Sequence, residues 1–153
     1  MGEALNGLKR SIMCGEARES HIGQKVTVMG WVQRNRNLGG LQFLDLRDRE
    51  GILQIVFKDT LSEEILAKAK QIRPEYCIAV TGEIAKRESI NNNIPTGMVE
   101  LIAEGVKILS ESETPPIYIK EDLDAAESIR LKYRYLDLRR PKIFNNLYYR
   151  FLI

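Results

Sequence analysis

Alternating apolar and polar positions predict three consecutive strands in the first half of the chain. The alternation runs over residues 25–32, resumes over 41–47 and continues over 51–57. Leu44 and Leu46 share one side of the second segment and Phe43 the other, because successive side chains of a strand point to opposite faces. Turn-forming residues, Gly39-Gly40 and the segment 48–51, separate the strands.

The hydrophobic period then changes to that of a helix. Apolar residues recur at helical spacing between Leu61 and Ile72, and Arg73-Pro74 ends the run. The segment 60–63, Thr-Leu-Ser-Glu, has the form of a capping box at the start of this helix. Two further strands are expected over residues 76–84 and 98–109, joined by a polar segment.

Five short strands with one helix between the third and fourth predict an all-β fold, the five-stranded Greek-key barrel called the OB-fold. We assign it to residues 1–109. Pro115-Pro116 introduces a linker and hinge over residues 110–140, in which Asp124 to Leu136 has a short helical pattern. Residues 141–153 start another helix with Pro141 in its first turn. Because this segment ends on exposed apolar residues, we expect the chain to be truncated.

The net charge of +2 does not by itself indicate a nucleic-acid partner, but the charge is unevenly distributed along the chain. Residues 110–128 hold six acids and one base, whereas residues 129–142 hold six bases and one acid. A single histidine and two distant cysteines argue against a disulfide framework, a metal site and histidine-dependent catalysis. With no long apolar run and no targeting segment, we expect a cytoplasmic protein without a membrane partner.

Residues suited to nucleic-acid binding gather on the predicted outer face of the barrel. Single-stranded binding by an OB-fold needs an aromatic ring for stacking, cations for phosphates and polar groups that read base edges. Phe43 and Gln54 lie on the polar sides of the second and third strands, with Arg34 and Arg36 at the end of the first. Two simpler alternatives stay open: Phe43 as a core residue and the arginines as solvated rim charges.

Several motifs together resemble the anticodon-binding domain of bacterial-type aspartyl-tRNA synthetases. The resemblance runs from about Cys14 to Pro141. Its motifs are Gly30-Trp31-Val32, Arg34-x-Arg36, Leu38-Gly39-Gly40, the run from Phe43 to Gly51, Gln54-Ile55-Val56-Phe57, the run from Tyr76 to Gly82, Thr96-Gly97-x-Val99-Glu100, and the hinge Ile129 to Pro141.

The resemblance implies roles for matching residues. Phe43 is expected to stack on an anticodon base, Gln54 to read the central uracil, and Arg36 to contact the anticodon with Arg34 near it. Arg87 and Glu100 are expected as further contacts with the anticodon loop. The family's common Arg-Arg-Arg-Asp run is replaced here by residues 34–37, Arg-Asn-Arg-Asn, so no role is carried over to positions 35 and 37.

The resemblance implies that the parent enzyme joins aspartate to tRNA with ATP and magnesium, and that it dimerises through its catalytic domain. Only the start of that class II domain would lie in residues 141–153, so we expect this chain to bind a GUC anticodon loop, to hold no cofactor, to be non-catalytic and to be monomeric. Two alternatives stay open: the OB-fold of an asparaginyl- or lysyl-tRNA synthetase, and an OB-fold module that binds protein or oligosaccharide.

Overall fold

The computed structural model describes residues 2–120 and 125–153, which form two compact units, Met1–Glu113 and Thr114–Ile153. The first unit begins with two single-turn 3-10 helices, Cys14–Glu16 and Glu19–His21. No helix in the described part of the chain has both the length and the apolar character needed to cross a membrane.

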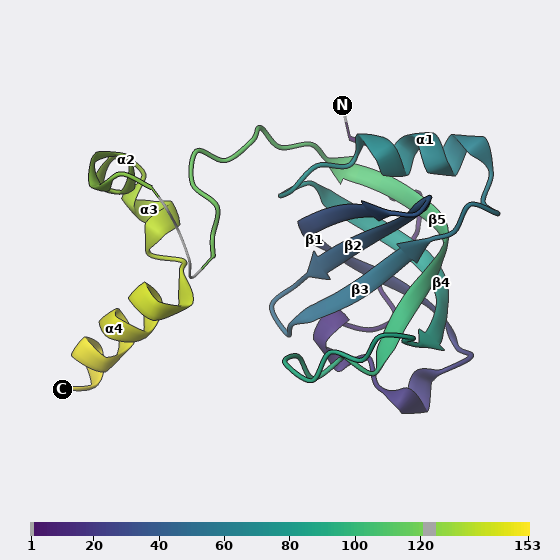
Figure 1. Ribbon diagram of the computed structural model, residues 1–153, viewed down its shortest axis with the longest axis horizontal. Helices are drawn as coiled ribbons and strands as arrows, with labels where there is room; N and C mark the ends of the chain where they lie inside the picture. The colour runs from purple at the N-terminus through teal and green to yellow at the C-terminus, as the bar shows by residue number, and fades with distance from the viewer. Residues whose placement is uncertain (1, 121–124) are drawn as a thin grey trace. The chain divides into compact units, whose positions relative to one another are not determined.

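The first unit is a closed five-stranded barrel (Figure 1). Its strands are β1 (Lys25–Leu38), β2 (Leu41–Arg47), β3 (Ile52–Phe57), β4 (Cys77–Lys86) and β5 (Val99–Ser110). Around the barrel they follow the order β1-β2-β3-β5-β4, and β4 pairs with β1 to close it. All neighbours are antiparallel except β3 and β5, which are parallel. The predicted OB-fold is therefore confirmed.

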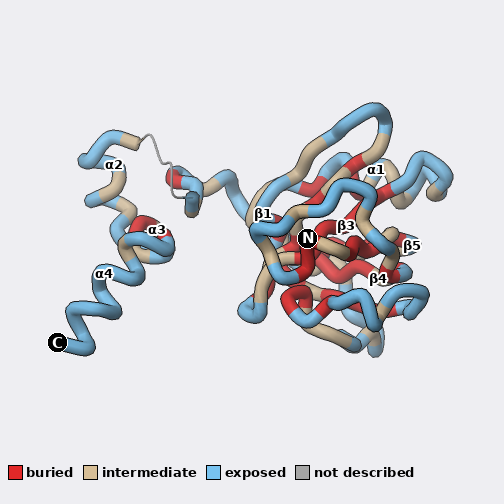
Figure 2. Tube along the Cα trace, turned by 60° about the horizontal axis from the view of Figure 1, so that its bottom comes forward, coloured by how far each residue is buried: buried red, intermediate tan, exposed pale blue. Residues whose placement is uncertain are grey.

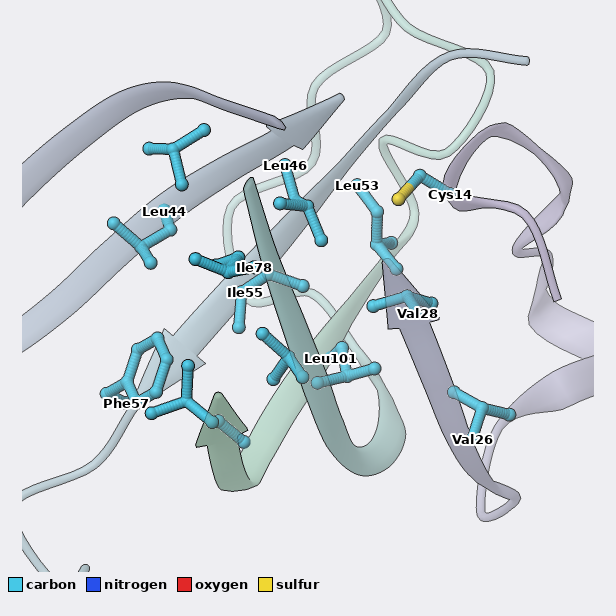
Figure 3. Packing of buried hydrophobic residues seen from close by; sticks show 14 of the residues in the cluster. Cys14, Val26, Val28, Leu44, Leu46, Leu53, Ile55, Phe57, Ile78 and Leu101 are labelled. Carbon is cyan, nitrogen blue, oxygen red and sulfur yellow. The ribbon is translucent and has the colours of Figure 1, made fainter. Parts of the chain in front are cut away.

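The core lies inside the barrel, where buried residues from every strand meet (Figure 2). Leu44 and Leu46 point inward and are fully buried, as the alternation predicted. Leu53, Ile55 and Phe57 of β3 join them, and Figure 3 shows these side chains packed with those of neighbouring strands. Phe43 is only half-buried and belongs to the outer face, so the alternative of a core Phe43 is wrong.

Strand β1 is six residues longer than predicted and contains a β-bulge between Val32 and Arg34. Before the bulge, Val32 pairs with Leu46 and is buried in the core. After it, Arg34 pairs with Asp45 on the outer face of β2. Because a bulge adds one residue to one strand only, it reverses which side chains face outward. Arg34 and Arg36 therefore point to the outside of the barrel.

Helix α1 (Glu63–Gln71) lies across one end of the barrel (Figure 1) and contributes Ala69 to the core. The predicted capping box is wrong: Ser62 is the N-cap, without a side-chain cap hydrogen bond. The C-terminal end is satisfied instead by two barrel side chains. Gln42 Nε2 donates to the carbonyl of Ala69, and Asn35 Nδ2 donates to that of Ile72 at 2.8 Å. The carbonyl of Ala69 also accepts a hydrogen bond from the backbone N–H of Ile72, so Gln42 is its second donor.

The second unit contains α2 (Glu127–Lys132), α3 (Arg134–Asp137) and α4 (Pro141–Leu152). The pattern from Asp124 to Leu136 thus forms two short helices, and its first residue lies outside the described residues. Fully buried Asp137 accepts hydrogen bonds from Arg130 and Arg140. Burial would raise the pKa of Asp137, but the hydrogen bonds from the arginines outweigh it, so its pKa lies below the ordinary value.

The hydrogen bonds of Gln42 to α1 make its loss costly. We expect Gln42→Leu to lower the free energy of unfolding by about 1–3 kcal/mol, because the Ala69 carbonyl and the Asn35 side chain each lose the hydrogen bond from Gln42. Urea titration followed by circular dichroism measures the change. The matched control is Gln71→Leu, at an exposed position in the same helix, and an equal effect of both variants would contradict the capping role.

Candidate nucleic-acid interface

A cavity of about 360 Å³ opens on the outer face of the barrel. Its walls come from all five strands and from the segments that follow β3 and β4. OB-folds bind single strands on the face of the second and third strands and with the loop between the fourth and fifth. The lining residues are Arg36, Leu38, Leu41, Phe43, Gln54, Val56, Lys58, Ala85, Lys86, Arg87, Glu88, Ser89, Glu100 and Ile102.

Strand register brings the lining residues together in two rows. In the first row Phe43 pairs with Arg36 on one side and with Val56 on the other. In the second row Gln54 pairs with Asp45 of β2 and with Glu100 of β5. The half-buried ring of Phe43 is thus flanked by a cation and an aliphatic side chain, and it lies one row away from a buried amide.

A polar network crosses the cavity between β1 and β5. Arg36 Nη2 donates to Asp45 Oδ1 at 3.2 Å and makes a longer contact of 3.5 Å to Gln54 Oε1. Gln54 Nε2 in turn donates to Glu100 Oε2 at 2.8 Å. Both ends of the Gln54 amide therefore have partners, which orients it although the residue is only 5% exposed.

Two donors of the cavity are buried without a partner. Arg36 Nε and Arg87 Nε have no hydrogen-bond acceptor within the structure. An unpaired buried donor costs free energy that an incoming acceptor restores. The two guanidinium groups are thus ready to bind oxygen or nitrogen atoms of a ligand.

The carboxyl group of Glu100 is the most perturbed titratable group of the cavity. Burial raises its pKa above the ordinary value of 4.5, and the hydrogen bond from Gln54 only partly opposes this shift. As an acceptor on the cavity wall, Glu100 can receive a hydrogen bond from an amino or imino group of a base.

Five of the six predicted site residues line this one cavity, and Arg34 does not. Arg36, Phe43, Gln54, Arg87 and Glu100 converge, whereas Arg34 is exposed on the same face outside it. Sequence reasoning missed Asp45, which holds Arg36, and Lys58 and Lys86, which add positive charge to the rim. Asp45 lies two residues from Phe43 on the same strand and therefore on the same outer face, which was the available signal for Asp45.

A family model described as the OB-fold nucleic acid binding domain matches residues 26–109, more than half of the chain. This chain belongs to that family. The matched range contains the whole cavity and all five strands apart from their outermost residues, Lys25 and Ser110.

Relatives of this OB-fold chain are aminoacyl-tRNA synthetases. It is 86% identical over 145 residues to the aspartate–tRNA ligase of Clostridium perfringens, covering 95% of this chain and 24% of that protein. Asparaginyl-tRNA synthetase from Pyrococcus horikoshii matches with a TM-score of 0.70 and 32% identity, over 88% of this chain and 30% of that one. Aspartyl-tRNA synthetase from Entamoeba histolytica, which is 22% identical, shares the fold. Its TM-score is 0.76, and the match covers 90% of this chain and 34% of that one. The chain thus spans about a quarter of the curated relative.

The described residues of the OB-fold chain include no group of three or more His, Cys, Asp or Glu side chains placed to hold a metal ion. Two carboxylates of β2 and of the turn that follows it already have partners. Asp45 pairs with Arg36, and Asp48 accepts hydrogen bonds from the backbone of Cys14, Glu50 and Gly51.

The raised pKa of Glu100 gives a pH prediction. The unfolded carboxyl ionises near its ordinary pKa of 4.5, whereas the folded one stays protonated to higher pH. Its contribution to stability is therefore complete below pH 4.5 and is lost as the pH rises through the folded pKa. Glu100→Gln removes this loss, so the variant should gain stability relative to the parent as the pH rises above 4.5.

Urea unfolding of parent and variant at several pH values measures this difference. The matched control is Glu113→Gln, which removes an exposed carboxylate from the end of the same unit. A difference between parent and Glu100→Gln that does not change with pH would contradict the desolvation of Glu100.

Proposed function

We propose that this chain is the anticodon-reading part of an aspartate–tRNA ligase and that its cavity binds the bases of a GUC anticodon. The convergence of Phe43, Gln54, Arg36, Arg87 and Glu100 on one cavity carries the proposal. The identity of 86% to an aspartate–tRNA ligase supports this choice of tRNA.

The chemistry of the cavity suits unstacked bases. The half-buried ring of Phe43 offers a face for stacking, which is how proteins hold bases of single-stranded loops. Arginine side chains pair with guanine O6 and N7, and a carboxylate accepts from the amino group of cytosine. Arg36 and Arg87 supply the first kind of group and Glu100 the second. The Gln54 amide combines a donor with an acceptor, which matches the mixed edge of uracil.

Selectivity follows from the polar network of the RNA-free cavity. The amide of Gln54 is held by Arg36 and Glu100, so an entering base must replace those hydrogen bonds with its own. A base that cannot do so leaves buried groups unpaired, at a cost of about 1–3 kcal/mol for each group. A correct base additionally satisfies the donors of Arg36 and Arg87 that have no partner.

The catalytic steps would belong to parts of the ligase outside these 153 residues. We infer that ATP and magnesium bind there, that dimerisation occurs there, and that the present chain does not form aspartyl-adenylate on its own. We place the ligase in the cytoplasm, where it would meet tRNA.

A second candidate is the reading of an asparagine anticodon. The asparaginyl-tRNA synthetase from Pyrococcus horikoshii, at 32% identity and a TM-score of 0.70, supports it. The GUU anticodon of asparagine tRNA differs from GUC in its third base, so a direct comparison of the two separates the candidates.

Removal of the stacking ring is the first test. We expect Phe43→Ala to weaken binding of a GUC anticodon stem-loop by about 1–3 kcal/mol, the range for stacking of one base on an aromatic side chain. Fluorescence anisotropy of a labelled stem-loop measures it, with stem-loops carrying GUU and UUU compared at the same salt concentration. Phe144→Ala, which removes an exposed Phe from α4, is the control. Equal affinity of Phe43→Ala and parent would refute the assignment.

Arg34 and Gln54 should affect different quantities. Exposed Arg34 is expected to contact phosphate, so Arg34→Gln should weaken all sequences alike and reduce the slope of log affinity against log salt by about 0.7. Gln54→Leu should instead reduce the discrimination between GUC and GAC stem-loops and leave that slope unchanged. Titrations at several salt concentrations give both quantities. A sugar- or protein-binding barrel would show no steep salt dependence, which would sink the proposal.

A further inference from the structure

The cavity accounts for only part of an RNA interface. Its volume of about 360 Å³ accommodates few bases, whereas OB-folds bind about 4–16 nucleotides. If the proposed function holds, the rest of the loop must contact neighbouring surface. Further binding residues are therefore to be sought along the strands that form the cavity.

The outer face of β1 and β2 continues from the cavity to a second hollow. Trp31 lies on this face at the other side of the bulge and pairs with Arg47 of β2. Phe43 and Arg47 are four residues apart on β2, a distance of roughly 13 Å at about 3.3 Å per residue. The hollow of about 300 Å³ is lined by Arg10, Met13, Trp31, Asp48 and Arg49.

Trp31 is presented to solvent rather than packed. The residue is 47% exposed, although it occupies the middle of a strand that is paired on both sides, with Cys77 of β4 and with Arg47. It is also the only tryptophan of the chain. A single exposed apolar side chain is ordinary. The groups around Trp31 therefore decide whether it belongs to a binding surface.

Two arginines flank the indole ring, and one of them is held in place. Arg10 Nη2 donates to the carbonyl of Met29 at 3.3 Å, and its Nη1 contacts Met13 Sδ at 3.1 Å. These contacts fix the guanidinium beside the strand that carries Trp31. The other, Arg49, forms an ion pair with its neighbour Glu50 on the exposed β2–β3 turn. Exposed pairs of this kind contribute little, so a phosphate can replace the carboxylate.

The one acid in the hollow is already occupied. Asp48 is buried, and its carboxylate accepts hydrogen bonds from the backbone N–H groups of Cys14, Glu50 and Gly51. It therefore shapes the turn that carries Arg49. The two arginines add cationic donors beside an exposed ring, which is the combination that binds single-stranded nucleic acid.

We propose that the Trp31 patch, made of Arg10, Met13, Trp31 and Arg49, binds a nucleotide of the same RNA that flanks the anticodon. The base stacks on the indole ring, and the adjacent phosphates lie at the two arginines. This inference rests on the proposed function, because the RNA reaches the patch from the cavity. The opposite rim, with Lys58 and Lys86, offers cations without a ring and favours phosphate contact only.

The sole tryptophan makes the parent chain its own reporter. A GUC stem-loop is titrated while Trp fluorescence and the anisotropy of the labelled RNA are followed together. We expect the stem-loop to change Trp31 fluorescence with the same midpoint as the anisotropy, and the trinucleotide GUC to leave it unchanged.

Substitutions supply the second measurement. Trp31→Ala should weaken stem-loop binding about 5- to 100-fold, Trp31→Phe should recover most of the loss, and Arg10→Gln should flatten the salt dependence. Tyr118→Ala, which removes a ring of similar exposure, is the control and should bind like the parent. Circular dichroism checks that each variant folds. If Trp31→Ala does not fold, the fluorescence titration of the parent alone tests whether the Trp31 patch contacts the RNA.

The outcomes separate this inference from the proposed function. Tight binding that depends on Phe43, with unchanged Trp31 fluorescence and parent-like affinity of Trp31→Ala and Trp31→Phe, would overturn the patch and leave the anticodon proposal standing. That result would also be expected if the patch serves a protein partner. Absence of stem-loop binding by the parent would overturn both.

Discussion

The parallel pairing of β3 with β5 is the constraint on which the rest of the structure depends. It joins segments 46 positions apart, in the register Gln54 to Glu100. This contact joins the strands β1, β2 and β3 to the pair of β5 and β4, and the inward side chains of β3 are fully buried in the resulting barrel. It also shields the outward side chains, because both strands flank the cavity. One backbone register thus creates the core and the polar centre of the site.

The β-bulge in β1 affects the core, the outer face and the end of helix α1. By adding one residue it lets a single strand supply Val32 to the core and then Arg36 to the outer face. It also turns Asn35 inward, where its amide bonds to the carbonyl of Ile72 after α1. Asn35 therefore supports the end of a helix and does not belong to the outer face.

The polar groups of the cavity are arranged so that they can exchange or add hydrogen bonds when a ligand binds. Gln54 has partners at both ends, Glu100 is held in a desolvated site that raises its pKa, and two arginine Nε atoms have no acceptor. A ligand with matching acceptors can therefore add hydrogen bonds to those already present. The same outer face leads on to Trp31, which under the proposed function extends the path of an RNA strand along β1 and β2.

Local pattern was sufficient to predict the five strands and the helices α1 and α4. Alternation placed Leu44 and Leu46 inside and Phe43 outside, and Pro141 marked the first turn of α4, because these features depend on neighbouring residues alone. The tertiary structure decided what pairs across the barrel. The extension of β1, the Gln42 and Asn35 caps, the Gln54–Glu100 bond and the exclusion of Arg34 from the cavity all depend on strand register. Register between distant strands is set by closure of the barrel as a whole, which no local period encodes.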